Sequence, residues 1–325
     1  MAATAVLVAV AAGALALALG APLWTTAFAL MAFGVLHNAL ELRYVGGRFP
    51  GLLQGPYLLG LVGLITGIVV ARLIGSIAGA GWSVRAEILL SYGLLATAVV
   101  VGSRARSRRR WRAPAVALLA GAALVSLRWP DHHVVVITHL HNLVPLGFLW
   151  ELSRPMARRP RRAFRATQLG WVVVVPALIL AGLFDGALPP GAADVPGLGG
   201  ISRIAPFSSL PDTWDTTAGR RFLAVFAFLQ LMHFVIWVVV IPRCTPRATA
   251  TFEARVPVLR GRRFWWVAGA GAGAFAVLFL VDYAEGRSAY AALASYHAYL
   301  ELPILIGVAL AATAGGRDRP PVLRA

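Results

Sequence analysis

Ten apolar runs divide this sequence, and each is close to the length of a helix that crosses a lipid bilayer. Such a helix needs about 20 mainly apolar residues, within a range of about 17 to 25. The sequence therefore predicts an all-α fold, a polytopic integral membrane helix bundle with about ten transmembrane helices in a single domain over residues 1–325. The runs lie at 4–20, 22–42, 57–79, 86–103, 113–128, 132–152, 168–187, 221–241, 264–282 and 290–313.

The composition also indicates a membrane protein. Hydrophobic residues make up 59% of the chain and charged residues 13%, whereas soluble domains carry about 25% charged residues. A soluble core cannot bury this much apolar surface, so we expect the lipid bilayer to be the main partner. The abundance of arginine, alanine, glycine and proline is typical of a GC-rich genome, and we predict a multi-pass protein of a bacterial cell membrane.

The residue types exclude several functional classes. Lysine is absent and all 30 basic residues are arginine, so a retinal or other Schiff base on a lysine amine cannot form. The single cysteine, Cys244, rules out a disulfide framework, a CxxC pair and covalent c-type haem attachment. The net charge of +17 does not indicate nucleic acid as a partner, because the arginines lie in short loops between apolar runs, as topology signals do.

The arginine-rich loops orient the predicted helices. Arginine concentrates in cytoplasmic loops, and ten crossings with both termini in the cytoplasm place the loops 104–112, 154–165 and 243–263 on one side. Removing the short run 113–128 would place the first two of these loops on opposite sides, which supports keeping it. The run 4–20 has no positively charged segment before it, which favours a retained helix over a cleaved signal peptide.

One long loop, 188–220, falls on the predicted outer side. It is rich in proline, glycine and serine, which disfavour regular structure. A loop of this length is usually either functional or disordered. The sequence is consistent with a lid over an outward-facing cavity or with a plain tether.

Histidine and glutamate side chains fall inside four of the predicted spans, within one layer of the bilayer. Each ionisable group at that depth costs about 3 kcal/mol on insertion scales, so such groups face the interior of a bundle and pair with a partner. A bound cation would compensate for the lost water, and we therefore predict an intramembrane metal site. Its candidate ligands are His37, Glu41, His139, His141, His233, His297 and Glu301.

Two of these segments share a ligand spacing. The stretches HNALE, from His37 to Glu41, and HAYLE, from His297 to Glu301, each place a histidine and a glutamate four residues apart. Residues at this spacing lie on one face of a helix. An imidazole and a carboxylate can therefore converge on one point, which is a two-ligand contribution to a metal site.

His139 and His141 differ from these pairs. Two residues along a helix correspond to a rotation of about 200°, so one regular helix cannot direct both imidazoles to one ion. Pro145 favours a distorted helix here, because its ring clashes with the carbonyl group of His141, four residues earlier. Two neighbouring histidines, His132 and His133, fall at the predicted outer boundary, where water can solvate them.

Arg72 is the one arginine predicted deep inside a span. Its side chain either forms an ion pair with Glu301 or extends toward the interface. The functional alternative makes Arg72 a candidate substrate-binding residue that holds the anionic head of a substrate.

The favoured function is an iron-dependent oxidoreductase that activates oxygen against a lipophilic substrate. Imidazole and carboxylate ligands without a thiolate suit iron, manganese, zinc or copper, and a bilayer supplies lipophilic substrates directly. The HxxxH and HxxHH clusters of membrane desaturases and hydroxylases do not occur in this chain. The site would therefore be of a different design.

Two alternatives remain open. The HxH of THLHN resembles the helix of haem–copper oxidases in which two histidines face opposite ways and ligate two haems, and this resemblance implies haem b and electron transfer. It covers five residues, and axial ligation would need opposed histidines from different helices. The second alternative is a transporter in which histidine and glutamate relay protons or carry a metal cation.

Overall fold

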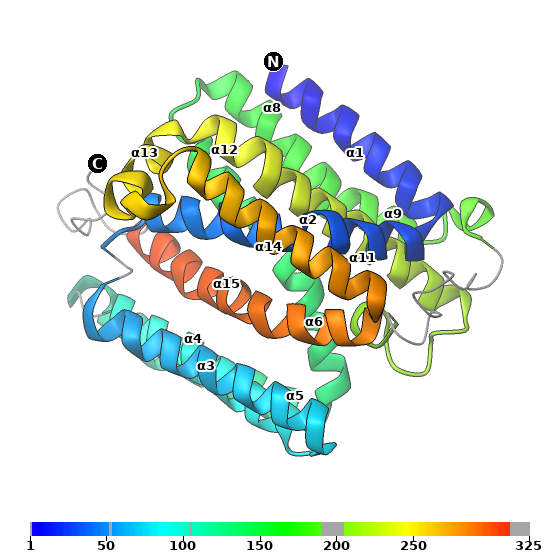
Figure 1. Cartoon of the computed structure of the whole chain (residues 1–325), viewed down its shortest axis with the longest axis horizontal. Helices are drawn as coiled ribbons and strands as arrows, with labels where there is room; N and C mark the ends of the chain where they lie inside the picture. The colour runs from blue at the N-terminus through cyan, green and yellow to red at the C-terminus, as the bar shows by residue number, and fades with distance from the viewer. Residues whose placement is uncertain (1, 52–53, 104–105, 190–204, 313–325) are drawn as a thin grey trace. The chain divides into compact units, whose positions relative to one another are not determined.

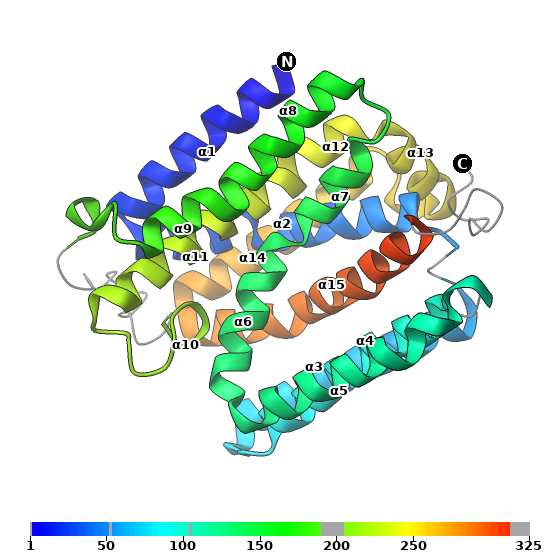
Figure 2. The same cartoon turned by 180° about the vertical axis from the view of Figure 1, so that it is seen from behind.

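The computed structural model describes residues 2–51, 54–103, 106–189 and 205–312. Over these residues the chain is helical and contains no strand (Figures 1 and 2). The α-helices are α1 (Ala2–Gly20), α2 (Pro22–Arg48), α3 (Gly55–Ala78), α4 (Ser83–Gly102), α5 (Arg112–Arg128), α6 (Pro130–Leu143), α7 (Pro145–Leu152), α8 (Arg158–Leu169), α9 (Val175–Leu180), α10 (Ala205–Ser208), α11 (Thr217–Val235), α12 (Ile241–Cys244), α13 (Pro246–Arg255), α14 (Arg262–Val281) and α15 (Tyr283–Ala312).

Nine helical segments within the described residues are long and apolar enough to cross a membrane. They are Pro22–Arg48, Gly55–Ala78, Ser83–Gly102, Arg109–Arg128, Pro130–Leu152, Arg158–Leu180, Thr217–Cys244, Arg262–Val281 and Tyr283–Ala309. A shorter apolar helix, Thr4–Gly20, corresponds to the first run. The prediction of an all-helical fold is confirmed for the described residues, and they contain nine candidate spans where about ten were predicted.

Two segments differ from the sequence-based expectation. The helix expected at 168–187 begins at Arg158 and its span ends at Leu180, because the arginine-rich stretch before it is itself helical. Of the predicted outer loop 188–220, residues 190–204 lie outside the described residues. Its second half contains the short helix α10, and α11 begins at Thr217, where the side chain of Thr216 accepts a hydrogen bond from the backbone N–H of Gly219.

The chain forms two compact units that interleave along the sequence. The first unit contains Met1–Leu40, Val134–Cys244 and Trp266–Arg287. The second contains Glu41–His133, Thr245–Trp265 and Ser288–Ala325. Four of the five boundaries fall inside α2, α6, α14 and α15, and the fifth follows the end of α12 at Cys244.

Helix α11 forms the core of the first unit. It packs against α1, α9 and α10, and α1 also packs against α8. Nearly every residue from Leu223 to Phe234 is buried, as expected for a helix that is apolar on all sides. Because α11 is enclosed by neighbouring helices, a polar side chain on it, such as that of His233, faces protein.

Three helices form the body of the second unit. Helix α4 packs against both α3 and α5, and the three lie side by side in both views (Figures 1 and 2). The turn after α3 uses Gly79 in the left-handed conformation (φ 61°), which glycine adopts without steric cost. The hydroxyl groups of Tyr92 on α4 and Ser126 on α5 are hydrogen-bonded at 3.0 Å.

Two π-helices interrupt the first unit, and both follow the same sequence pattern. The segments η2 (Gly170–Val174) and η5 (Ile236–Val240) lie within the stretches GWVVVVP and IWVVVIP. In each, a backbone N–H bonds to the carbonyl five residues earlier, and the next residue is proline, Pro176 or Pro242. Proline has no N–H and its ring clashes with the carbonyl four residues earlier, so a wider turn before it accommodates the ring.

Helix α13 packs closely on the end of α2 in the second unit. Arg43 forms an ion pair with Glu253, and its guanidinium carbon lies 4.4 Å from the ring centre of Phe264. The backbone N–H of Gly261 also donates to Glu253, at 3.1 Å. Together with Arg43, this bond holds the pKa of the Glu253 carboxyl below its usual range.

Gly47 permits this contact between α2 and α13. A Cβ atom at position 47 would overlap the backbone carbonyl of Ala248, which cannot rotate away. Gly47→Ala is therefore expected to lower the free energy of unfolding by about 1–3 kcal/mol, the usual cost of overpacking, as measured by thermal unfolding in detergent. Gly93→Ala is the matched control, because a Cβ there meets no atom within 4 Å. Equal effects of the two substitutions would contradict the close contact.

Candidate metal centre

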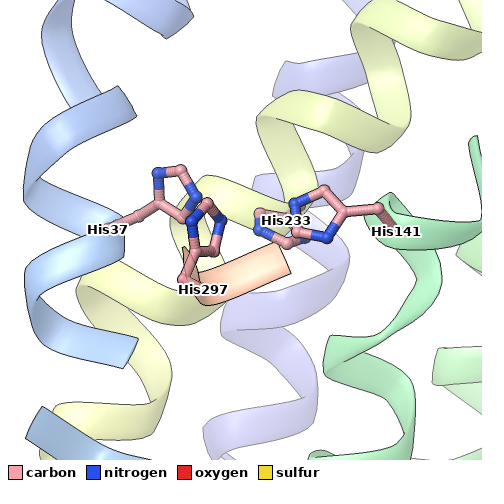
Figure 3. Close-up of side chains that lie close together, drawn as sticks. All are labelled: His37, His141, His233 and His297. Atoms are coloured by element: carbon pink, nitrogen blue, oxygen red, sulfur yellow. The ribbon is translucent and has the colours of Figure 1, made fainter. Parts of the chain in front are cut away.

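Three histidines of the first unit gather at one point. His37 comes from α2, His141 from α6 and His233 from α11. One ring nitrogen of each lies within 4.8 Å of the corresponding nitrogens of the other two, and Figure 3 shows the rings directed toward one another. His37 and His233 are buried, at 1% and 0% exposure. We refer to these three residues as the histidine cluster.

The ring spacing of the histidine cluster matches that of neighbouring ligands on one metal ion. The ring centres of His37 and His233 are 5.1 Å apart, and those of His141 and His233 are 4.6 Å apart. A metal–nitrogen bond of about 2 Å places each ring centre about 3.2 Å from the ion. Ligands about 90–110° apart then have ring centres about 4.5–5.2 Å apart, whereas opposed ligands have them about 6.4 Å apart. The observed distances fit adjacent ligands.

The backbone next to two of these histidines departs from regular α-helix. His233 lies three residues before the π-helix η5. His141 lies at the end of α6, where Pro145 breaks the hydrogen-bond pattern and the carbonyl of His141 accepts instead from the N–H of Val144, at 3.1 Å. Such irregular turns are common at functional sites. In both cases the irregular turn lies between the histidine and the regular α-helix that follows it.

The third histidine is oriented by its own helix. The Nδ1 atom of His37 lies 3.2 Å from the carbonyl oxygen of Phe33. Because a carbonyl only accepts, Nδ1 carries the proton and Nε2 presents its lone pair. A ligand histidine in proteins normally bonds through its second nitrogen in this way, which fixes the ring and raises its basicity.

Aromatic rings border the histidine cluster on one side. Phe234 has its ring centre 4.5 Å from that of His37 and 5.8 Å from that of His233. Phe33 lies beyond it, 6.4 Å from Phe234. An apolar border excludes water, which strengthens electrostatic interactions within the cluster.

His139 lies apart from the histidine cluster, although only one residue separates it from His141. Its Nε2 atom donates to the carbonyl oxygen of Ser208, at 2.9 Å. Its ring packs edge-on against Phe226 and Phe222, with centres 5.6 and 6.2 Å away. His139 therefore connects α6 to α10 and α11, as expected from the opposite directions of the two histidines on one helix.

The other predicted ligands belong to the second unit. His297, which Figure 3 also draws, and Glu301 lie one turn apart on α15, and Glu41 lies near the end of α2. The Nε2 atom of His297 is 4.0 Å from a carboxylate oxygen of Glu41. Carboxylate oxygens of Glu41 and Glu301 lie within 4.8 Å of each other. The exposed fractions of these residues are 2% or less.

Arg72 pairs with Glu87, not with Glu301 as the sequence suggested. Its Nε atom donates to Glu87 at 2.9 Å, and a second guanidinium nitrogen contacts the other carboxylate oxygen. Further bonds reach Ser295 at 2.8 Å and the carbonyl of Ala291 at 3.3 Å. Tyr299 completes the network by donating to Glu87 at 2.6 Å. The role of Arg72 in substrate binding stays a prediction.

Sequence reasoning missed Glu87 and Tyr299 as the residues that hold Arg72. Glu87 lies at the start of its helix, where a carboxylate is expected to reach the interface, yet it is 8% exposed. The signal was present, since Glu87 is an acid within an apolar span. His133 was also expected in water, but it is buried, and its Nδ1 lies 3.0 Å from the hydroxyl oxygen of Ser126.

Comparisons of the chain with protein-family models, curated proteins and solved structures found no match.

Proposed function

We propose that this protein binds a transition metal at His37, His141 and His233 and uses it to oxidise a lipophilic substrate. The observation that carries this proposal is the ring spacing of the histidine cluster, 5.1 and 4.6 Å between ring centres. Three imidazoles bound to one ion would leave its other positions open for a substrate or a small molecule.

Iron is the metal we propose. Non-haem iron oxygenases hold Fe(II) through two histidines and one carboxylate on one face and keep open positions, and here a third imidazole would take the place of the carboxylate. A ferrous ion in this setting would supply the activation of dioxygen, which we propose as the oxidant. The chain itself would position the ion, exclude water through Phe234 and Phe33, and keep His37 in the tautomer that binds metal.

The apolar helices support a substrate that is dissolved in the membrane. The nine candidate spans give the chain extensive apolar surface, and a lipid or another lipophilic molecule can approach such a protein from the bilayer. We propose that the protein resides in the cell membrane of a bacterium with a GC-rich genome, with both termini in the cytoplasm.

The ring spacing favours this proposal over haem b. Two axial histidines oppose each other across a haem iron, which requires ring centres about 6.4 Å apart for bonds of about 2 Å. The two pairs that include His233 are closer than this, so His233 does not oppose either His37 or His141 as an axial ligand would. Transport of protons or metal ions remains the alternative if the protein binds no redox-active metal.

Metal analysis of the purified protein tests the proposal. We expect the chain in detergent to contain about one equivalent of iron or more and to show no Soret absorption band. Under anaerobic conditions nitric oxide, a probe for open positions on Fe(II), is expected to give the electron paramagnetic resonance signal of a high-spin ferrous nitrosyl. A Soret band would select haem, and zinc alone or no metal would contradict an oxidoreductase.

A further inference from the structure

We propose that Glu41, His297 and Glu301 bind a second divalent cation, in the second unit. The distance between His297 Nε2 and the nearer Glu41 oxygen carries this inference. At 4.0 Å it exceeds the length of a hydrogen bond. Two ligands on opposite sides of one ion, with bonds of about 2.0–2.2 Å, would have their atoms about 4.2 Å apart, close to the observed separation.

The helix geometry brings the third ligand to the same place. His297 and Glu301 are four residues apart on α15, so both side chains project from one face of that helix. The carboxylate oxygens of Glu41 and Glu301 lie within 4.8 Å of each other. The imidazole and the two carboxylates are therefore candidate ligands of one ion.

The charges of this cluster favour a divalent ion. Glu41 and Glu301 are 1% and 0% exposed, and both lie within helices long enough to cross a membrane. Two carboxylates that share a buried site repel each other when both are ionised, and one protonated imidazole can balance only one of them. A divalent cation balances both charges at once and replaces the lost water.

The ligand types indicate the class of cation. Two carboxylates favour manganese and other hard ions, whereas imidazole favours iron, zinc and later metals. A first-row divalent ion satisfies both kinds of ligand. This site contains carboxylates where the histidine cluster contains only imidazoles, and the inference does not depend on the proposed oxidoreductase function.

Cobalt alone is a suitable probe, because Co²⁺ binds mixed nitrogen and oxygen ligands more tightly than Mn²⁺ or Fe²⁺. The full-length protein, freed of metal by a chelator, is expected to bind about two Co²⁺ per chain. Glu301→Gln keeps the shape of the side chain and removes its charge, and it is expected to bind about one. His297→Gln is expected to do the same. Glu285→Gln is the matched control, since Glu285 lies on α15 but is exposed, and it should retain two.

Two results would overturn the inference. One is a wild-type protein that binds one Co²⁺ or none. The other is a pair of variants, Glu301→Gln and His297→Gln, that both retain two. Size-exclusion chromatography distinguishes a variant that has lost the site from one that has lost its fold. If neither variant folds, the number of Co²⁺ ions bound per wild-type chain decides whether the second site exists.

The His233→Ala variant separates this test from that of the proposed function. It is expected to lose one Co²⁺ and to keep the one that depends on Glu301. If the wild type binds a single Co²⁺ that depends on His233 and not on Glu301, the second cation is refuted and the histidine cluster stands. If the ion that depends on Glu301 is present and none depends on His233, the reverse holds.

Discussion

His233→Ala is expected to carry one metal equivalent fewer per chain than the wild type. His233 is the member of the histidine cluster whose ring lies against both others, at 5.1 and 4.6 Å. Removing even an outer partner of a metal ligand lowers affinity by about 10–100-fold, and removing a ligand should cost more. The protein is expected to lose the iron of this site during purification, as measured by elemental analysis and by loss of the ferrous nitrosyl signal.

His139→Ala is the matched control for this substitution. His139 also lies in a candidate span of the same unit, but its Nε2 donates to the carbonyl of Ser208. This variant is expected to keep its metal and to lose only some stability. If His233→Ala keeps the iron content of the wild type, or if His139→Ala loses as much iron, the histidine cluster is not the metal site.

Glu87→Gln is expected to destabilise the protein by about 1–3 kcal/mol, because Glu87 is buried, the Arg72 side chain is 32% exposed, and their hydrogen bonds are left partly unmade. The substitution leaves the guanidinium of Arg72 without its counter-ion, and it replaces one of the two oxygens that accept from Arg72 and Tyr299 by an amide nitrogen, which only donates. Thermal unfolding in detergent, followed by intrinsic tryptophan fluorescence, measures the change. Glu285→Gln, a neutralised but exposed carboxylate, is expected to unfold like the wild type.

A double substitution makes this prediction sharper. Replacing both charges, with Arg72→Met and Glu87→Met together, leaves neither group uncompensated. Replacing a buried ion pair with apolar residues is often neutral, so most of the loss should be recovered. A double variant as unstable as Glu87→Gln would show that Arg72 and Glu87 act separately.

The sequence predicted much of this architecture because a bilayer imposes simple rules. A span must be apolar and long, so the helices could be located from hydropathy alone. Ionisable groups at depth are costly, so His37, His141 and His233 could be identified as unusual and expected to meet. The same cost also explains why Arg72 has a counter-ion. The sequence suggested Glu301, whereas the counter-ion is Glu87.

Other features could not be predicted, for physical reasons that differ from case to case. The arginine-rich segment 158–165 was predicted to be a loop, because charged residues next to a span occur both in helices and in irregular loops. Arg72 pairs with Glu87 and not with Glu301 because of the way α3, α4 and α15 pack. The spacing of apolar residues in the sequence does not predict this packing. Helical rotation indicated that His139 and His141 face opposite ways, but the sequence still placed both among the metal ligands. The acceptor of His139, the carbonyl of Ser208, comes from a distant part of the chain.

The π-helix η5 at Ile236–Val240 rotates the residues that follow it about the helix axis. One additional residue per turn rotates everything beyond it by about 100° relative to an uninterrupted α-helix. A stripe of residues that includes His233 therefore does not continue straight into Ile241–Cys244. Deleting one residue between them would restore a continuous stripe and would rotate Ile241–Cys244 about the helix axis relative to His233.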